Sequence, residues 1–203
     1  MRERHTFIAI ALLSLLSVAA AAQDQDGYDF RKTRWGMSVA QVKASETNNL
    51  LTQSSNNIYD EVLVYNTKAY SFQATLAYFF INNRLESGSY LFKVSHSNKT
   101  TVIVDYGDIK NNLIKTYGDP KKSETIWKDD LYKDDLNNLG LAISLGHVEI
   151  RNLWETPTTE IFLSLFGHEG EVLFALSYES LELQPIAETR KKALEKETHE
   201  NHK

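Results

Sequence analysis

The chain has 203 residues, of which 42% are apolar and 11% aromatic, and it carries a net charge of −5 with no cysteine. The apolar content is too high for a disordered chain and is enough for one ordinary domain or two small ones. The lack of cysteine excludes disulfides, thiolate metal sites, a cysteine nucleophile and lipid attachment through an N-terminal cysteine. The acidic balance argues against nucleic acid or an anionic membrane as a partner.

Residues 1–22 have the pattern of a signal peptide. A short basic region precedes an apolar run over residues 7–18, and small residues ending at Ala22 form a cleavage site before Gln23. The run is shorter than the ~20 residues that span a bilayer. We therefore expect a soluble protein, periplasmic or secreted after cleavage near Ala22, with no membrane span in the mature chain. Removal of residues 1–22 takes away two Arg and one Glu, which leaves a net charge of −6.

The first folded element is predicted to be a helix that begins at Ser38 and fades near Asn48. Ser38 and Gln41 have the spacing of a capping box, and Met37 and Val42 have the spacing of a hydrophobic staple. The polar residues that follow, as far as Asn57, are expected to form a loop.

Alternating apolar residues then predict three strands in the first half of the chain. They cover residues 58–66, 70–81 and 84–94, with Asn82-Asn83 as a two-residue hairpin turn and Gly88 as a possible bulge.

The second half begins with a helix predicted over Asp105–Tyr117, which Gly118 and Pro120 terminate. Residues 101–104 fit either a short strand or the first turn of this helix. Five strands or strand fragments are predicted to follow, over residues 121–127, 141–145, 148–154, 159–166 and 172–180, and the last hairpin turn is expected at 167–170. The tail after Pro185 is predicted to be a solvated, fraying helix.

These elements predict an α+β fold, in which an antiparallel sheet carries helices on one face. The hairpin residues 82–85 align in pattern with 169–172, so we expect a tandem α-β-β-β repeat. Its units would be residues 23–97 and 98–183, followed by a charged tail at 184–203. The alternative is one continuous sheet with two helices on a face.

Two short motifs resemble known bacterial envelope domains. Trp35-Gly36-Met37-Ser38 with Val42 resembles the opening of SmpA/OmlA (BamE-like) domains, and Tyr117-Gly118-Asp119-Pro120 resembles the Gly-x-Pro that ends the helical part of that fold. The β-lactamase inhibitor proteins look like tandem copies of the same fold, which agrees with the expected repeat. Those inhibitors carry disulfides and the SmpA/OmlA lipoproteins carry a lipid-bearing cysteine, both of which this chain lacks. The resemblance implies a non-enzymatic envelope protein that binds another protein.

Two polar clusters are candidates for chemistry. His147, Glu149 and Arg151 alternate on one predicted strand, so they could ligate a metal or act as acid and base, or be the ordinary polar side chains of a solvent-facing strand. The repeated KDDLYKDD segment at 128–135 could hold calcium, but it lacks the EF-hand spacing and glycine, so a solvated loop is the preferred interpretation.

Aromatic residues are concentrated in the first half, and alternation along the strands cannot bury all of them on one face. We expect Tyr65, Phe79 and Tyr90 to lie on a sheet face that recognises a partner, since tyrosine supplies contact area at a small entropy cost. The alternative is that a helix or the second half of the chain covers that face.

The function predicted from the sequence is an exported binding or inhibitory module that acts through a sheet face on another protein of the bacterial envelope. No serine-nucleophile, phosphate-binding or dinucleotide-binding motif is present, so an enzyme is not expected, and neither is a cofactor or metal. The alternatives are a small periplasmic hydrolase or metal-dependent enzyme, and a carbohydrate-binding or small-ligand-binding protein.

Overall fold

The computed structural model describes residues 27–93, 96 and 98–200, and its strands form one eight-stranded antiparallel sheet. The predicted α+β class is therefore confirmed. The predicted signal peptide lies outside the described residues. Among the residues that are described, no helix is both long and apolar enough to cross a membrane.

The described residues form four α-helices and eight strands. In order they are α1 (Val39–Ser45), β1 (Leu50–Ser54), β2 (Glu61–Ala69), β3 (Phe72–Ile81), β4 (Arg84–Lys93), α2 (Thr101–Tyr117), β5 (Lys122–Trp127), a 3-10 turn (Leu136–Asn138), α3 (Leu139–Ser144), β6 (Val148–Glu155), β7 (Thr159–His168), β8 (Glu171–Ser180) and α4 (Gln184–Glu200).

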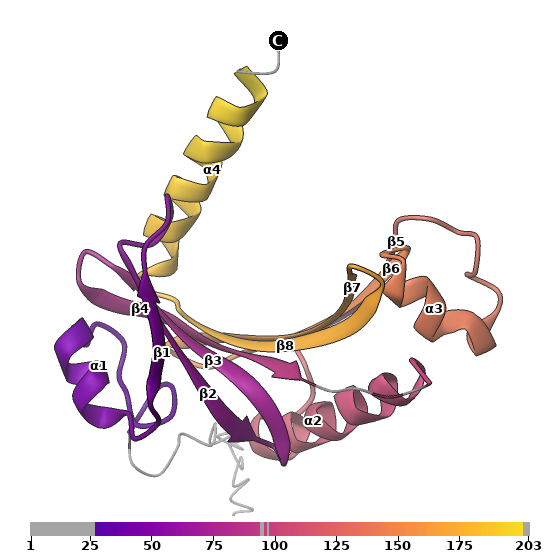
Figure 1. Cartoon of the computed structure of the whole chain (residues 1–203), viewed down its shortest axis with the longest axis horizontal. Helices are drawn as coiled ribbons and strands as arrows, with labels where there is room; N and C mark the ends of the chain where they lie inside the picture. Colours follow the sequence, from indigo (N-terminus) through magenta and orange to yellow (C-terminus); the bar gives the residue numbers. More distant parts are fainter. Residues whose placement is uncertain (1–26, 94–95, 97, 201–203) are drawn as a thin grey trace, which may run out of the picture.

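The strand order across the sheet is β1-β2-β3-β4-β8-β7-β6-β5. Each half is thus a meander of consecutive strands, and the two meanders meet where β4 pairs with β8. β1 and β5 lie at the two edges. Figure 1 shows the sheet as an arc, with α1 and α2 beneath its convex side and α4 rising from its concave side.

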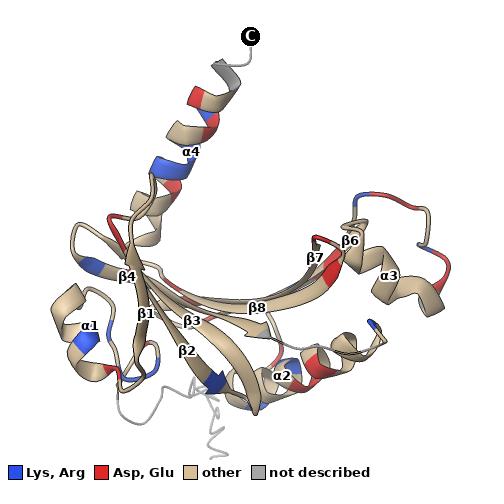
Figure 2. Cartoon of the chain, in the orientation of Figure 1, with Lys and Arg blue, Asp and Glu red and all other residues tan. Residues whose placement is uncertain are grey.

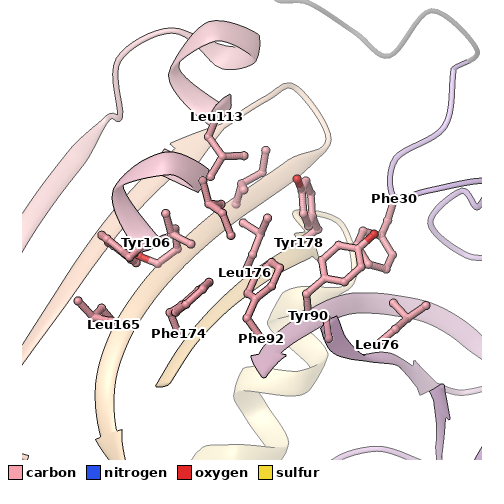
Figure 3. Close-up of a cluster of buried hydrophobic side chains, with 14 of the residues drawn as sticks. Phe30, Leu76, Tyr90, Phe92, Tyr106, Leu113, Leu165, Phe174, Leu176 and Tyr178 are labelled. Carbon is pink, nitrogen blue, oxygen red and sulfur yellow. The ribbon is translucent and has the colours of Figure 1, made fainter. Parts of the chain in front are cut away.

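One face of this sheet, called here the covered face, holds the main core. Large apolar side chains alternate along β3, β4, β7 and β8 and are almost fully buried there. Figure 3 shows how Tyr106 and Leu113 of α2 lie over this layer. At the seam between the halves, the rings of Phe92 and Phe174 stack with centroids 4.8 Å apart. The side chains of both halves therefore make one continuous core.

The segment that precedes α1 also packs on the covered face. Phe30 is buried against the rings of Tyr78, Tyr90 and Tyr178. It lies directly over Gly88, where an added Cβ would stand 2.2 Å from the Phe30 ring. The predicted bulge at Gly88 is therefore wrong, because this glycine serves the close approach of Phe30.

The bulge lies two residues earlier. β4 pairs Leu85 with Phe80 and Ser87 with Phe79, which leaves Glu86 as the extra residue. An extra residue on one strand of an antiparallel pair bends that strand.

Local capping and turn signals were good guides to the structure. Ser38 and Gln41 form the predicted capping box at the start of α1. Asn82 and Asn83 have φ values of 52° and 58°, as the predicted hairpin turn requires. Residues 101–104 form the first turn of α2, and Gly118, with a φ of 80°, caps its end.

Two predicted elements are wrong. The sequence predicts a strand over residues 141–145, but residues 141–144 belong to α3, whose Ala142 and Ile143 are buried in the core, and Leu145 is its C-cap. α3 lies so close to β7 that a Cβ on Gly167 would stand 1.8 Å from the carbonyl oxygen of Ile143. The polar stretch after α1, expected to be a loop, contains the edge strand β1.

The close packing at Gly88 has a measurable consequence. We expect Gly88→Ala to lower the free energy of unfolding by about 1–3 kcal/mol, because the new methyl group would push into the buried Phe30 ring. The matched control is Gly107→Ala in α2, where no atom lies within 4 Å of the new Cβ. That change should stabilise the protein by about 0.5–1 kcal/mol, since alanine is the better helix former.

Urea unfolding followed by circular dichroism measures both free energies. Equal effects of the two substitutions would show that Phe30 is not held against Gly88.

Candidate functional site

The concave side of the sheet presents a broad surface, called here the open face. It is formed by side chains that alternate with the core residues of β3, β4, β7 and β8, and all of them are half-buried or exposed. They are Thr75, Ala77, Ser89, Leu91, Phe162, Ser164, Leu173, Ala175 and Ser177.

The strand register makes this surface continuous. Ala175 pairs with Leu91 on one side and with Ser164 on the other, and Ser177 pairs with both Ser89 and Phe162. Residues directly opposite each other on neighbouring strands share a face. The nine side chains therefore form one patch across the seam between the two halves.

The centre of the open face is uncharged, and all but three of its nine side chains, Leu91, Phe162 and Leu173, are small. Figure 2 shows the middle of the sheet without charged residues, which gather at the sheet ends and on the helices. Leu91, 38% exposed, is the most accessible large apolar side chain of the patch. Small residues at the centre let the main chain of a partner approach the sheet closely.

The sequence prediction placed Tyr65, Phe79 and Tyr90 together on a recognition face, and the structure corrects this. Tyr65 and Tyr90 are 2% and 7% exposed and lie in the core of the covered face. Phe79 does lie on the opposite face, where it is half-buried with its ring 4.8 Å from that of Tyr59. Alternation assigns residues to two faces, but it does not say which face the helices cover.

Tyr78 and Tyr90 of the covered face belong to a polar network around Glu46. The Glu46 carboxylate accepts hydrogen bonds from Tyr78 Oη (2.8 Å), from the main chain of Thr47 and Asn48, and from Arg31, whose Nε lies 3.2 Å away. Burial alone would raise the pKa of Glu46, but these hydrogen bonds and the Arg31 charge lower it overall.

A pocket of about 270 Å³ opens beside this network, lined by Arg31, Lys32, Ser45, Glu46, Thr47 and Tyr78. Arg31 adopts a φ of 55°, which is rare for a side-chain-bearing residue, and also donates a hydrogen bond to Tyr90 Oη. The Glu46 carboxylate already accepts hydrogen bonds from several donors of its own chain. The Arg31–Glu46 pair, called here the Glu46 clamp, therefore ties the segment before α1 to the sheet.

The alternative polar cluster is only partly assembled. Glu149 and Arg151 form a bidentate ion pair, with Nε–Oε1 and Nη2–Oε2 distances of 2.7 and 2.9 Å. Burial would raise the pKa of Glu149, but its bonds to Arg151 and the nearby Lys128 lower it. The ring of His147 instead stacks on Tyr132, 5.9 Å between centroids.

Residues 27–93, 96 and 98–200 contain no arrangement of side chains that would bind a metal ion. No group of three or more His, Asp or Glu side chains converges there in a way that could hold an ion. In the predicted loop at 128–135, the carboxylate of Asp130 pairs with Lys133, and that of Asp129 accepts a hydrogen bond from the main chain of Leu131.

A feature that the sequence reasoning missed is the seat of α4 at one end of the open face. Glu86 is 1% exposed, and its Oε2 has no hydrogen-bond partner among the described residues. Glu179 of β8 lies close by, and Lys191 and Glu188 face the two carboxyl groups from α4. The available signal was a glutamate two and four residues before Gly88 and Tyr90, where alternation along β4 assigns a charged side chain to the buried side of the strand.

Burial raises the pKa of Glu86 to about 7. A hydrogen bond from Ser87 lowers this pKa, and the negative charge of Glu179 raises it further. Burial also raises the pKa of Glu179, although Lys191 opposes the shift, and that of Tyr59, to about 12. α4 is fixed beside this cluster by Arg190, which binds Asp60 Oδ1 at 2.9 Å and the carbonyl oxygen of Ile58 at 2.7 Å.

Comparison with known proteins gives no relative for this chain: no family model, curated protein or solved structure matches it.

The buried carboxyl under α4 predicts an unusual dependence of stability on pH. Since the folded-state pKa of Glu86 lies above its ordinary value of 4.5, the folded protein binds the extra proton, and this stabilisation is lost as the pH rises through about 7. Between about pH 5.5 and about pH 8 we expect the free energy of unfolding to fall by roughly 2–3 kcal/mol from this group.

The Glu86→Gln variant should lack this fall, because its amide does not titrate, whereas Glu169→Gln at an exposed turn should keep it. Urea unfolding at both pH values measures the difference. If Glu86→Gln keeps the whole of the wild-type slope, the carboxyl is not buried as described.

The Glu46 clamp predicts a second effect on stability. We expect Glu46→Gln to lower the free energy of unfolding by about 3 kcal/mol, because it leaves the half-buried Arg31 charge without its counter-ion. Glu182→Gln removes a carboxylate that pairs with Arg84 at an exposed position, and it should cost less than about 1 kcal/mol. Thermal or urea unfolding of the two variants side by side tests this, and equal losses would contradict the clamp.

Proposed function

We propose that this protein is an exported binding or inhibitory module that holds another protein of the bacterial envelope on the open face of its sheet. The observation that carries the proposal is the continuous, uncharged patch that spans β3, β4, β8 and β7 and remains accessible while helices cover the opposite face.

A protein partner fits this surface better than a small ligand does. The patch is broad and shallow, whereas sites for small molecules are concave pockets that bury most of the ligand. An uncharged centre with charges at its margin is the usual composition of a protein interface. At one margin stands the Glu149–Arg151 ion pair, and at the other stand Glu160 and Glu179, which Gln184 of α4 contacts.

The polar margin also gives the partner an orientation. Arg151 is exposed next to Ser164 on the neighbouring strand, so its guanidinium can meet a carboxylate of a protein seated on the patch. In this proposal the predicted residues Glu149 and Arg151 contribute to the rim of a binding face rather than to catalysis.

We also infer that the fold is a tandem repeat, now of α-β-β-β-β units. Both strands of the hairpin β3–β4 have a counterpart 87 residues later in β7–β8. β3 begins at Phe72 and β7 at Thr159, and β4 begins at Arg84 and β8 at Glu171. The pairing across the seam agrees with this offset. Ser87 corresponds to Phe174 in the second half, and Phe92 corresponds to Glu179. Ser87 pairs with Glu179 and Phe92 pairs with Phe174, so exchanging the two halves gives the same set of pairs. A repeat explains why the open face is built equally by the two halves.

The proposal predicts that one large charge at the centre of the open face abolishes binding. We expect Ala175→Arg to reduce the amount of captured partner by at least about tenfold, because the side chain would protrude from the patch and carry an unpaired charge into the interface. The matched control is Val104→Arg on α2, where the residue is 62% exposed on the far side of the molecule.

The experiment is capture from envelope extract with the wild-type protein and both variants, read by quantitative mass spectrometry. A protein held in stoichiometric amount by the wild type and by Val104→Arg, but lost with Ala175→Arg, supports the proposal. Equal capture by all three proteins, or a glycan as the bound species, overturns it. Urea unfolding establishes that both variants are folded.

A further inference from the structure

The two edges of the sheet differ in a way that bears on assembly. β1 is the terminal strand of the sheet and pairs only with β2, so its outer main-chain groups have no partner strand within the described part of the chain. All five of its residues are exposed, and Leu50 and Leu51 are 42% and 54% accessible. An accessible edge of this kind is a template for another strand.

β1 itself carries no charged residue, although the ammonium group of Lys43 in α1 donates a hydrogen bond to Gln53 of this strand. Residues 47–59, which include the whole of β1, contain no Asp, Glu, Lys, Arg or His. The opposite edge, β5, carries exposed Lys122 paired with Glu124, and Lys121 directly precedes it. Charged side chains, lysine above all, are the usual protection of an edge strand. β5 therefore carries charges on the strand itself, whereas β1 has only Lys43 of the neighbouring helix.

We propose that the β1 edge pairs with β1 of a second copy of this chain, antiparallel and about a two-fold axis. A two-fold axis at Thr52 sets Leu51 opposite Gln53 and Leu50 opposite Ser54, so no like charges face each other although each copy is acidic overall. Each copy presents the same uncharged strand to the other, as an isologous two-fold contact requires.

The geometry of β1 also sets the strength of the contact. The strand has five residues, and its register shifts between Leu50 and Thr52, so the new ladder is short. An interface of this size is typical of weak association, and we expect a dissociation constant in the micromolar to millimolar range.

Pairing at this edge joins two eight-stranded sheets into one and leaves the open face of each copy accessible, since β1 lies outside the patch. A dimer then carries two equivalent patches on one extended sheet. A partner with two copies of its own epitope would gain affinity from such a pair without any new contact.

The test compares lysine substitutions at the two edges. Thr52→Lys sets two ammonium groups against each other at the axis, so it should weaken the dimer by at least about tenfold. Thr125→Lys places the same charge on the exposed threonine of β5 and should leave the dimer unchanged. Sedimentation equilibrium of the purified proteins, from about 20 µM to about 1 mM, measures the association.

Hydrogen exchange then locates the contact. Amides of residues 51–54 should exchange more slowly at high protein concentration in the wild type, and not in Thr52→Lys. A wild type that stays monomeric over the whole range overturns the proposal, as does a dimer that Thr52→Lys leaves intact. Protection of these amides by envelope extract alone also overturns it, because the edge then takes a different strand.

This test is independent of the proposed function. Thr52→Lys lies outside the open face and should still capture the envelope partner, whereas Ala175→Arg should lose the partner and still dimerise.

Discussion

The pairing of β4 with β8 is the interaction on which the rest of the molecule depends. It is the ladder that joins strands β1–β4 to strands β5–β8 within the described chain, from Ser87–Glu179 to Phe92–Phe174. The stacked rings of Phe92 and Phe174 lie on the covered side of this seam, beneath α2. This one ladder sets the register of both faces. The buried core and the open face are therefore both continuous across the seam.

Cover on one side explains why the other side is left free. The segment before α1 spans both halves of the chain: Trp35 Nε1 donates to Thr159 Oγ1 at 2.8 Å, and Gly36 and Met37 exchange main-chain hydrogen bonds with Leu85. With α1, α2 and α3 on the same side, little chain remains for the concave face. α4 reaches only one end of it, where Lys191 and Glu188 face the buried carboxyl group of Glu86.

The sequence could predict what local patterns determine, and it failed where distant contacts decide. The hairpin at Asn82-Asn83 and the capping box at Ser38 each depend on a few neighbouring residues, and both are confirmed. The apolar run at 141–145 is as suitable for a buried helix as for a strand, and its contact with Gly167 decides the outcome. Tyr65 was misplaced because alternation gives two faces, whereas the helices that select one of them are far away in sequence.

The two faces of the sheet differ in the size of their side chains at the seam between the halves. Side chains on the inner side of a bent sheet converge, so small ones are needed there, while large ones fill the outer side at the normal density of a core. Along β8, Leu173, Ala175 and Ser177 lie on the concave side, and Phe174, Leu176 and Tyr178 lie on the covered side. The bulge at Glu86 adds a local bend in the neighbouring strand β4. The seam therefore combines a closely packed core on one face with small, uncharged side chains on the other.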